Sequence, residues 1–136
     1  MEPNLHPNQR LIVDKLSYRL HSPQRNDIVV VDLPDMEEML VKRIVALPGE
    51  TVEYRSCVLY IDGKELVEPY LDPNVVTPTN CGGDQPSLEV PKDAVYVLGD
   101  NRGGSKDSRD LGPIEYDDII GRAFVVIWPA GDWRWL

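Results

Sequence analysis

Short runs of β-branched and aliphatic residues, each closed by proline, glycine or acidic residues, recur along the whole chain. This pattern is typical of strands joined by turns, whereas apolar residues three and four apart, the signature of helices, are nearly absent. We therefore expect an all-β fold of mostly antiparallel, barrel-like sheets with little helix, forming a single domain over residues 1–136. The expected strands are residues 10–15, 27–33, 39–47, 51–55, 58–61, 64–67, 94–98 and 119–128.

The segments between these strands carry their own signals. Residues 18–26 are polar and predict a loop, while Asp62-Gly63 supplies the residues that a tight hairpin turn prefers. Gly121, inside the last strand, predicts a bulge. Residues 68–92 are rich in proline and predict a long irregular insertion, a kind of segment that is often functional.

The strand predicted at 39–47 carries a lysine between apolar neighbours. Alternation places Leu40, Lys42, Ile44 and Ala46 on one face and Val41, Arg43 and Val45 on the other. Desolvation on such a face penalises the charged form, lowers the pKa of the lysine and makes a neutral amine available. The alternative is a lysine whose stem packs while its ammonium reaches water.

Composition excludes several classes of function. The net charge of −9 argues against nucleic-acid binding, which needs a basic face. No apolar run reaches the roughly 18 residues of a membrane helix, so the chain is expected to be soluble. The cysteines (Cys57, Cys81) and histidines (His6, His21) lack metal-ligand spacing, and we expect no metal and no cofactor. The two cysteines form either one disulfide or two free thiols.

A loop of polar residues and glycines follows the strand at 94–98. Residues 99–110 do not form a phosphate loop, because the order Gly104-Ser105-Lys106 differs from that motif and no helical pattern follows. They do not form a calcium loop either, since the twelfth position counted from Asp100 is Leu111 rather than glutamate. A plain solvated loop is one remaining interpretation.

The other interpretation joins this loop to Lys42. A lysine that acts as general base needs a neighbour to orient it, and Ser105 has a suitable hydroxyl. Asp107 and Arg109 have the chemistry of a local ion pair that holds the loop rigid. Asp100 and Arg102 are expected to form a second such pair.

Four segments in order resemble the bacterial type I signal peptidases, membrane-anchored serine proteases with a Ser-Lys dyad. Residues 1–5 (MEPNL) resemble the family's Ser-Met-x-Pro-Thr-Leu box without its serine, and residues 25–30 (RNDIVV) resemble its Arg-Gly-Asp-Ile-Val-Val box with Asn26 in place of glycine. Residues 41–50 (VKRIVALPGE) resemble the lysine box. Residues 99–113 (GDNRGGSKDSRDLGP) resemble the last box.

The resemblance implies a role for each matching residue. Lys42 is the general base, and Ser105 hydrogen-bonds and orients it. Asp107 and Arg109 brace the site. The rim of the site is shaped by Asp100, Asn101 and Arg102. Three residues line pockets for small side chains before the cut, with the substrate extended along the Lys42 strand: Met1, Leu5 and Val41.

One departure concerns the nucleophile, which in the family is the serine directly before the methionine that matches Met1. Ser17, Ser22 and Ser105 do not replace it. We interpret the chain as a soluble fragment, trimmed after the serine, and expect it to be inactive; the alternative is a natural homologue that lacks the serine.

The parent is then expected to remove signal peptides from exported preproteins, with an upstream anchor in the bacterial cell membrane and this domain on its outer face. Two alternatives are a self-cleaving repressor-type Ser-Lys protease domain, whose family lacks the 100–109 loop, and a non-catalytic β module that binds extended peptides.

Overall fold

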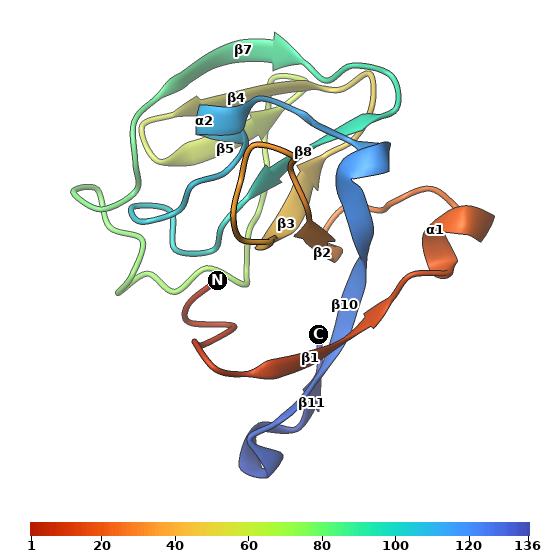
Figure 1. The fold of residues 1–136 in the computed structure, drawn as a ribbon. Helices are drawn as coiled ribbons and strands as arrows, with labels where there is room; N and C mark the ends of the chain where they lie inside the picture. Colours follow the sequence, from red (N-terminus) through yellow and green to blue (C-terminus); the bar gives the residue numbers. More distant parts are fainter.

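Two antiparallel sheets make up most of the molecule, as Figure 1 shows for the computed structural model of residues 1–136. The larger, seven-stranded sheet has the order β1-β10-β2-β3-β8-β9, with β11 paired to β10. Its strands are β1 (Arg10–Asp14), β2 (Ile28–Val31), β3 (Leu40–Ala46), β8 (Ala94–Leu98), β9 (Ile114–Glu115), β10 (Ile119–Trp128) and β11 (Arg134–Trp135).

The smaller, four-stranded sheet has the order β6-β5-β4-β7. Its strands are β4 (Thr51–Arg55), β5 (Val58–Ile61), β6 (Lys64–Glu65) and β7 (Gln85–Glu89). Helix is confined to single turns: α1 (Ser17–Leu20), α2 (Ser108–Leu111) and the 3₁₀ turns η1 (Tyr116–Asp118) and η2 (Ala130–Asp132). The prediction of a mostly antiparallel all-β fold is therefore confirmed. No helix combines the length and the apolar character needed to cross a bilayer.

All eight predicted strands are present, some of them shorter than expected. The turn at 62–63 has positive φ at both residues, as the hairpin requires. At Gly121 the pairing of β10 with β2 shifts register, and an added Cβ would overlap the backbone of Asp14, so the predicted bulge is confirmed.

Several short elements were not predicted, among them β9, β11, η1 and η2, and three others have a clear local reason. β7 lies inside the 68–92 stretch that was expected to be irregular; four of its five residues are exposed, so it carries no apolar alternation. α1 overlaps the start of the predicted loop at 18–26; Asp14 accepts hydrogen bonds from the N–H groups of Leu16 and Ser17 and so starts the turn. α2 follows the polar loop, where Asp107 caps it by accepting from the Arg109 N–H.

β3 lies at the centre of the core. Ile44 packs with β2 and β8 in one apolar cluster, while Val45 packs between the two sheets in another. Ala46 was expected on the face of Ile44 but packs with Val45, because the pairing of β3 with β8 shifts register between Ile44 and Ala46. The side chains on both faces of the second half of this strand are therefore buried.

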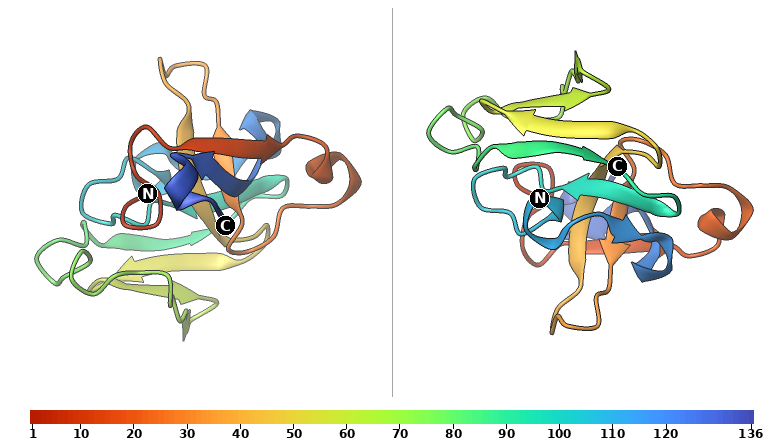
Figure 2. Two further views of the ribbon diagram at one scale, coloured as in Figure 1. Left: turned by 90° about the horizontal axis from the view of Figure 1, so that it is seen from below. Right: turned by 90° about the horizontal axis from the view of Figure 1, so that it is seen from above.

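The two cysteines, whose state the sequence left open, form a disulfide. Cys57 and Cys81 have Cα atoms 5.5 Å apart, and the bond fastens the end of the irregular stretch to the turn between β4 and β5. The stretch itself runs past the amino terminus, which lies beside the loop that follows β8 (Figure 2).

Candidate active site

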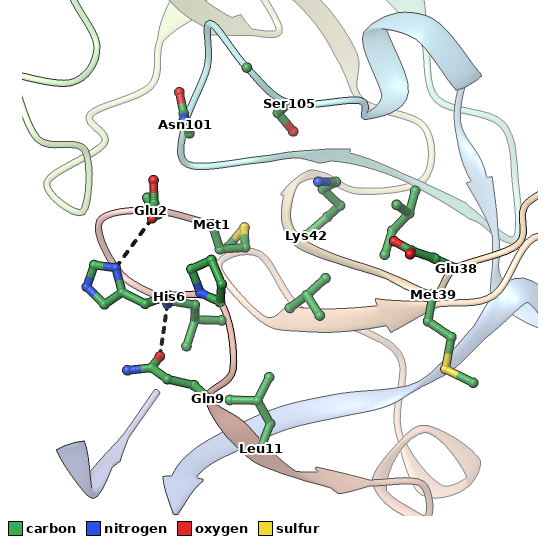
Figure 3. A pocket seen from close by; sticks show the side chains of 15 residues that line it. Met1, Glu2, His6, Gln9, Leu11, Glu38, Met39, Lys42, Asn101 and Ser105 are labelled. Carbon is green, nitrogen blue, oxygen red and sulfur yellow. Dashed lines mark hydrogen bonds and ion pairs between the residues drawn. The ribbon is translucent and has the colours of Figure 1, made fainter. Parts of the chain in front are cut away.

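A cleft of about 550 Å³ opens between the amino-terminal loop, the first half of β3 and the loop after β8 (Figure 3). It is lined by Met1, Glu2, Leu5, His6, Pro7, Gln9, Leu11, Glu38, Met39, Leu40, Val41, Lys42, Asn101, Gly104 and Ser105. Six of these lining residues are hydrophobic, and several others carry polar or charged side chains. The cleft therefore offers a ligand both apolar surface and polar groups.

One edge of β3 is unpaired along this cleft. Residues 40–43 pair with β2 on one side, but on the other side β8 ends at Leu98, opposite Arg43. No strand pairs with that edge at Leu40, Val41 and Lys42. An extended peptide can add to a free strand edge through main-chain hydrogen bonds, with its side chains in pockets at alternate positions.

The Lys42 side chain points toward the polar loop and is half-buried (Figure 3). Desolvation by burial lowers its pKa below the ordinary value for lysine, although the nearby charge of Asp107 acts in the opposite direction. Lys42 makes no ion pair and no hydrogen bond. The amine is thus partly desolvated while it borders the cleft, and its lowered pKa makes the neutral form more accessible than in a fully exposed lysine.

Gly99 explains how the loop can approach Lys42 so closely. A Cβ atom at this position would overlap the Ser105 hydroxyl and would lie 3.6 Å from Lys42 Nζ. The absent side chain therefore leaves a space that the amine and the hydroxyl both border.

The hydroxyl of Ser105 is buried and has no hydrogen-bond partner. The hydrogen bond that was expected between Ser105 and Lys42 is therefore not formed in this structure, although both groups border the same space beside Gly99. An unpaired buried polar group costs free energy, so a partner that reaches this hydroxyl is favoured.

The expected ion pair of Asp107 with Arg109 is present and bidentate, with Nε and Nη2 each 2.9 Å from a carboxylate oxygen. Asp107 is fully buried and also accepts from the Gly99 N–H at 3.0 Å. Burial by itself would raise the pKa of Asp107, but these hydrogen bonds hold it below its ordinary value. Arg109 donates further to the carbonyls of Cys81 and Arg102, so the pair fixes the loop against its surroundings.

The expected pair of Asp100 with Arg102 is wrong. Asp100 is fully buried and accepts from Arg43, with Nε at 2.9 Å and Nη2 at 2.8 Å, while Arg102 pairs with Glu68. Residues 100–102 lie in bends and a turn, so the strand alternation does not hold there, and each side chain has a partner far away in sequence. Asp100 and Arg102 are buried and do not line the cleft, so of the three residues expected at its rim only Asn101 lines it.

The three residues expected to form the pockets, Met1, Leu5 and Val41, all line the cleft. Leu5 is buried in the apolar cluster that β10 shares with Ile28, and Met1 and Val41 pack against it. Sequence reasoning missed Arg43, Glu68 and Tyr70 as members of the site. Arg43 directly follows Lys42 and so lies on the opposite face of the same buried strand. A cation at such a position indicates a buried carboxylate partner, and this signal was available in the sequence.

Comparisons with known proteins agree with this geometry. The family described as signal peptidase, peptidase S26, matches residues 1–128. A probable signal peptidase I-1 of Synechocystis is 38% identical over 141 residues, which cover 98% of this chain and 69% of the relative. A signal peptidase I of Bacillus amyloliquefaciens is 40% identical over 139 residues, 98% of this chain and 72% of the relative.

A solved structure is also similar. The crystal structure of a signal peptidase I from Enterococcus faecalis superimposes with a TM-score of 0.66 at 38% identity, covering 75% of this chain and 97% of that one. Fold and relatives together define a class, the serine endopeptidases with a β-sheet scaffold. The chain belongs to the signal peptidase family, peptidase S26, and the resemblance seen in its four segments is confirmed.

Proposed function

We propose that this chain is the substrate-processing domain of a type I signal peptidase, which removes amino-terminal signal peptides after small residues. The observation that carries the proposal is the position of Lys42. Its half-buried amine, with a lowered pKa, borders the cleft beside the free edge of β3 and next to the Ser105 hydroxyl. Membership of the family and the relatives named above support the same activity.

The proposed chemistry needs a serine at the position before Met1, where the family has its nucleophile. Neutral Lys42 takes the proton of the serine hydroxyl while the oxygen bonds to the substrate carbonyl carbon. The ammonium of Lys42 then returns that proton to the leaving amine as the peptide C–N bond breaks. A water molecule loses a proton to Lys42 and attacks the acyl-enzyme, and the serine oxygen leaves with that proton.

The remaining site residues are proposed to support this reaction. Ser105 orients the Lys42 amine, while the Asp107–Arg109 pair holds the loop that carries Ser105. Met1, Leu5 and Val41 leave room for only small side chains, which gives the preference for small residues before the cut. A membrane location, with the domain on the outer face, is expected for the intact enzyme; no metal takes part in the proposed steps.

The proposal is tested by adding the nucleophile. We compare the 136-residue chain with a serine-extended chain, which carries one serine before Met1, on a synthetic signal-peptide substrate. Only the serine-extended chain should cleave, and it should cleave after a small residue, while both chains should bind the peptide. Binding by both chains with cleavage by neither would contradict the proposal and favour a non-catalytic peptide-binding module.

A further inference from the structure

The irregular stretch after β6 contacts the active-site loops at three points. Glu68 pairs with Arg102, whose side chain is fully buried. The ring of Tyr70 covers the guanidinium of Arg43 at 4.1 Å. The carbonyl of Tyr70 accepts a hydrogen bond of 2.9 Å from the side chain of Asn4. The segment at residues 68–70 therefore contacts β3, the loop after β8 and the amino-terminal loop.

Asn4 is the point at which these contacts meet. Its amide donates one hydrogen to the Tyr70 carbonyl and another to Asp100 Oδ2, at 2.7 Å. Asp100 in turn accepts from Nε and Nη2 of Arg43, so all of its side-chain bonds join segments that are distant in sequence. The carbonyl of Asn4 accepts from Arg134, which fixes the backbone at the same residue.

This anchor lies close to the reacting groups. The Leu5 N–H donates to the Met1 carbonyl at 3.0 Å, so residues 1–5 form one turn whose end is held by Asn4. At the other end of this turn, Met1 lines the cleft together with Lys42. A serine before Met1 would thus extend from a turn whose orientation depends on the two hydrogen bonds of Asn4.

We propose that Asn4, held by the Tyr70 carbonyl and by Asp100, positions the amino-terminal turn against Lys42, with the 68–70 segment acting as its clamp. This inference rests on the proposed function and adds positioning residues to it. A threonine, which the family's box has at this place, offers one hydroxyl donor and can serve only one of the two acceptors. The amide of Asn4 serves both at once.

The first experiment measures turnover in the serine-extended chain. Asn4→Ala should lower kcat by ~100-fold while KM changes little, because a shift of about 1 Å in the nucleophile has an effect of that order. Asn4→Thr should restore part of the loss. Tyr70→Leu, which removes the ring over Arg43 but keeps the carbonyl, should lower kcat by ~10-fold.

Two matched controls separate positioning from general damage. Asn74→Ala removes an exposed amide of the same stretch that bonds only to Asp72. Tyr60→Leu removes a similar ring from an arginine, Arg55, at 4.7 Å, away from the site. Neither should change kcat.

A second experiment does not depend on activity. In the 136-residue chain, Asn4→Ala should accelerate hydrogen exchange at the Leu5 amide, while Asn74→Ala leaves it unchanged. Faster exchange with no activity in any serine-extended chain would contradict the proposed function and uphold the anchor. An active serine-extended chain whose kcat is unaltered by Asn4→Ala would overturn the inference, as would unchanged exchange at Leu5.

Discussion

Lys42 and Arg43 are neighbours on β3, and their surroundings differ in almost every respect. Arg43 is buried, is paired with Asp100 through two hydrogen bonds, and lies under the ring of Tyr70. Lys42 is half-buried on the other face, lacks any ion pair, and has a lowered pKa because burial removes water from its amine. The alternation of a strand puts a fixed cation and a titratable amine one residue apart.

The difference teaches how a strand can hold both a structural and a reactive cation. A guanidinium stays charged at all accessible pH values and suits a buried carboxylate bidentately, whereas an ammonium that lacks a partner shifts its pKa instead. The face of Arg43 therefore holds a fixed ion pair, and the face of Lys42 holds a cation whose pKa is free to shift. Substituting Lys42 should therefore lower activity, and substituting Arg43 should lower stability.

The largest expected effect comes from giving Lys42 the chemistry of its neighbour. In the serine-extended chain, Lys42→Arg should lower kcat/KM by ~100-fold to ~10,000-fold, since a guanidinium is never neutral and a general base contributes about that much. Peptide cleavage measures it, and Lys64→Arg on the exposed β6 hairpin is the control. Substantial turnover by Lys42→Arg would remove the general-base role.

Removing the fixed cation should instead act on stability. Arg43→Met leaves the carboxylate of Asp100 buried without its ion partner, which should lower the free energy of unfolding by about 3–5 kcal/mol. Urea unfolding measures this change. In the control, Arg55→Met breaks the exposed pair with Glu53 and should cost at most about 1 kcal/mol. Equal losses in the two variants would show that Arg43 is no more than a surface cation.

Filling the space beside Lys42 tests how tightly its face is packed. Gly99→Ala places a Cβ where the Ser105 hydroxyl lies, and such overpacking should destabilise the chain by about 1–3 kcal/mol. Thermal unfolding compares it with Gly83→Ala, where an added Cβ meets nothing within 4 Å. If both variants have the melting temperature of the unsubstituted chain, the loop is free to move away from Lys42.

The smallest effect is a pH dependence of stability. Because the pKa of Lys42 is lowered on folding, the unfolded chain holds more protons here than the folded chain between the lowered value and about 10.4. The cost of burying the cation is therefore complete below this window and vanishes above it. Lys42→Met should raise the melting temperature most near neutral pH, with a gain that shrinks as pH rises. A gain independent of pH, like that of the exposed control Lys64→Met, would contradict the lowered pKa.

Local pattern was enough to predict most of the strands, whereas the pocket residues Met1, Leu5 and Val41 came from the family resemblance. Turn residues marked the ends of the strands, and the alternation around Lys42 predicted a poorly solvated amine. The Asp107–Arg109 pair was also predictable, because both partners lie in one loop. What these features share is that each depends on residues close together in sequence.

The buried contacts between distant segments were not predictable in this way. Asp100 was assigned to Arg102, whereas its partner Arg43 is 57 residues away, and Arg102 binds Glu68 at a separation of 34. Exposed β7 carries no apolar alternation, so its pairing with β4 depends on backbone hydrogen bonds that composition does not record. The partner of a charged side chain is settled by which segments the fold brings together.

The unpaired edge at Leu40, Val41 and Lys42 has a consequence for selectivity. Main-chain amides and carbonyls are the same in every polypeptide. A strand edge that binds a peptide through them therefore does not discriminate between most peptide sequences. Selectivity between peptides then depends on the few peptide side chains that contact the wall of the cleft. If substrates bind to this edge as proposed, the site would accept many different sequences and exclude bulky side chains at only one or two positions.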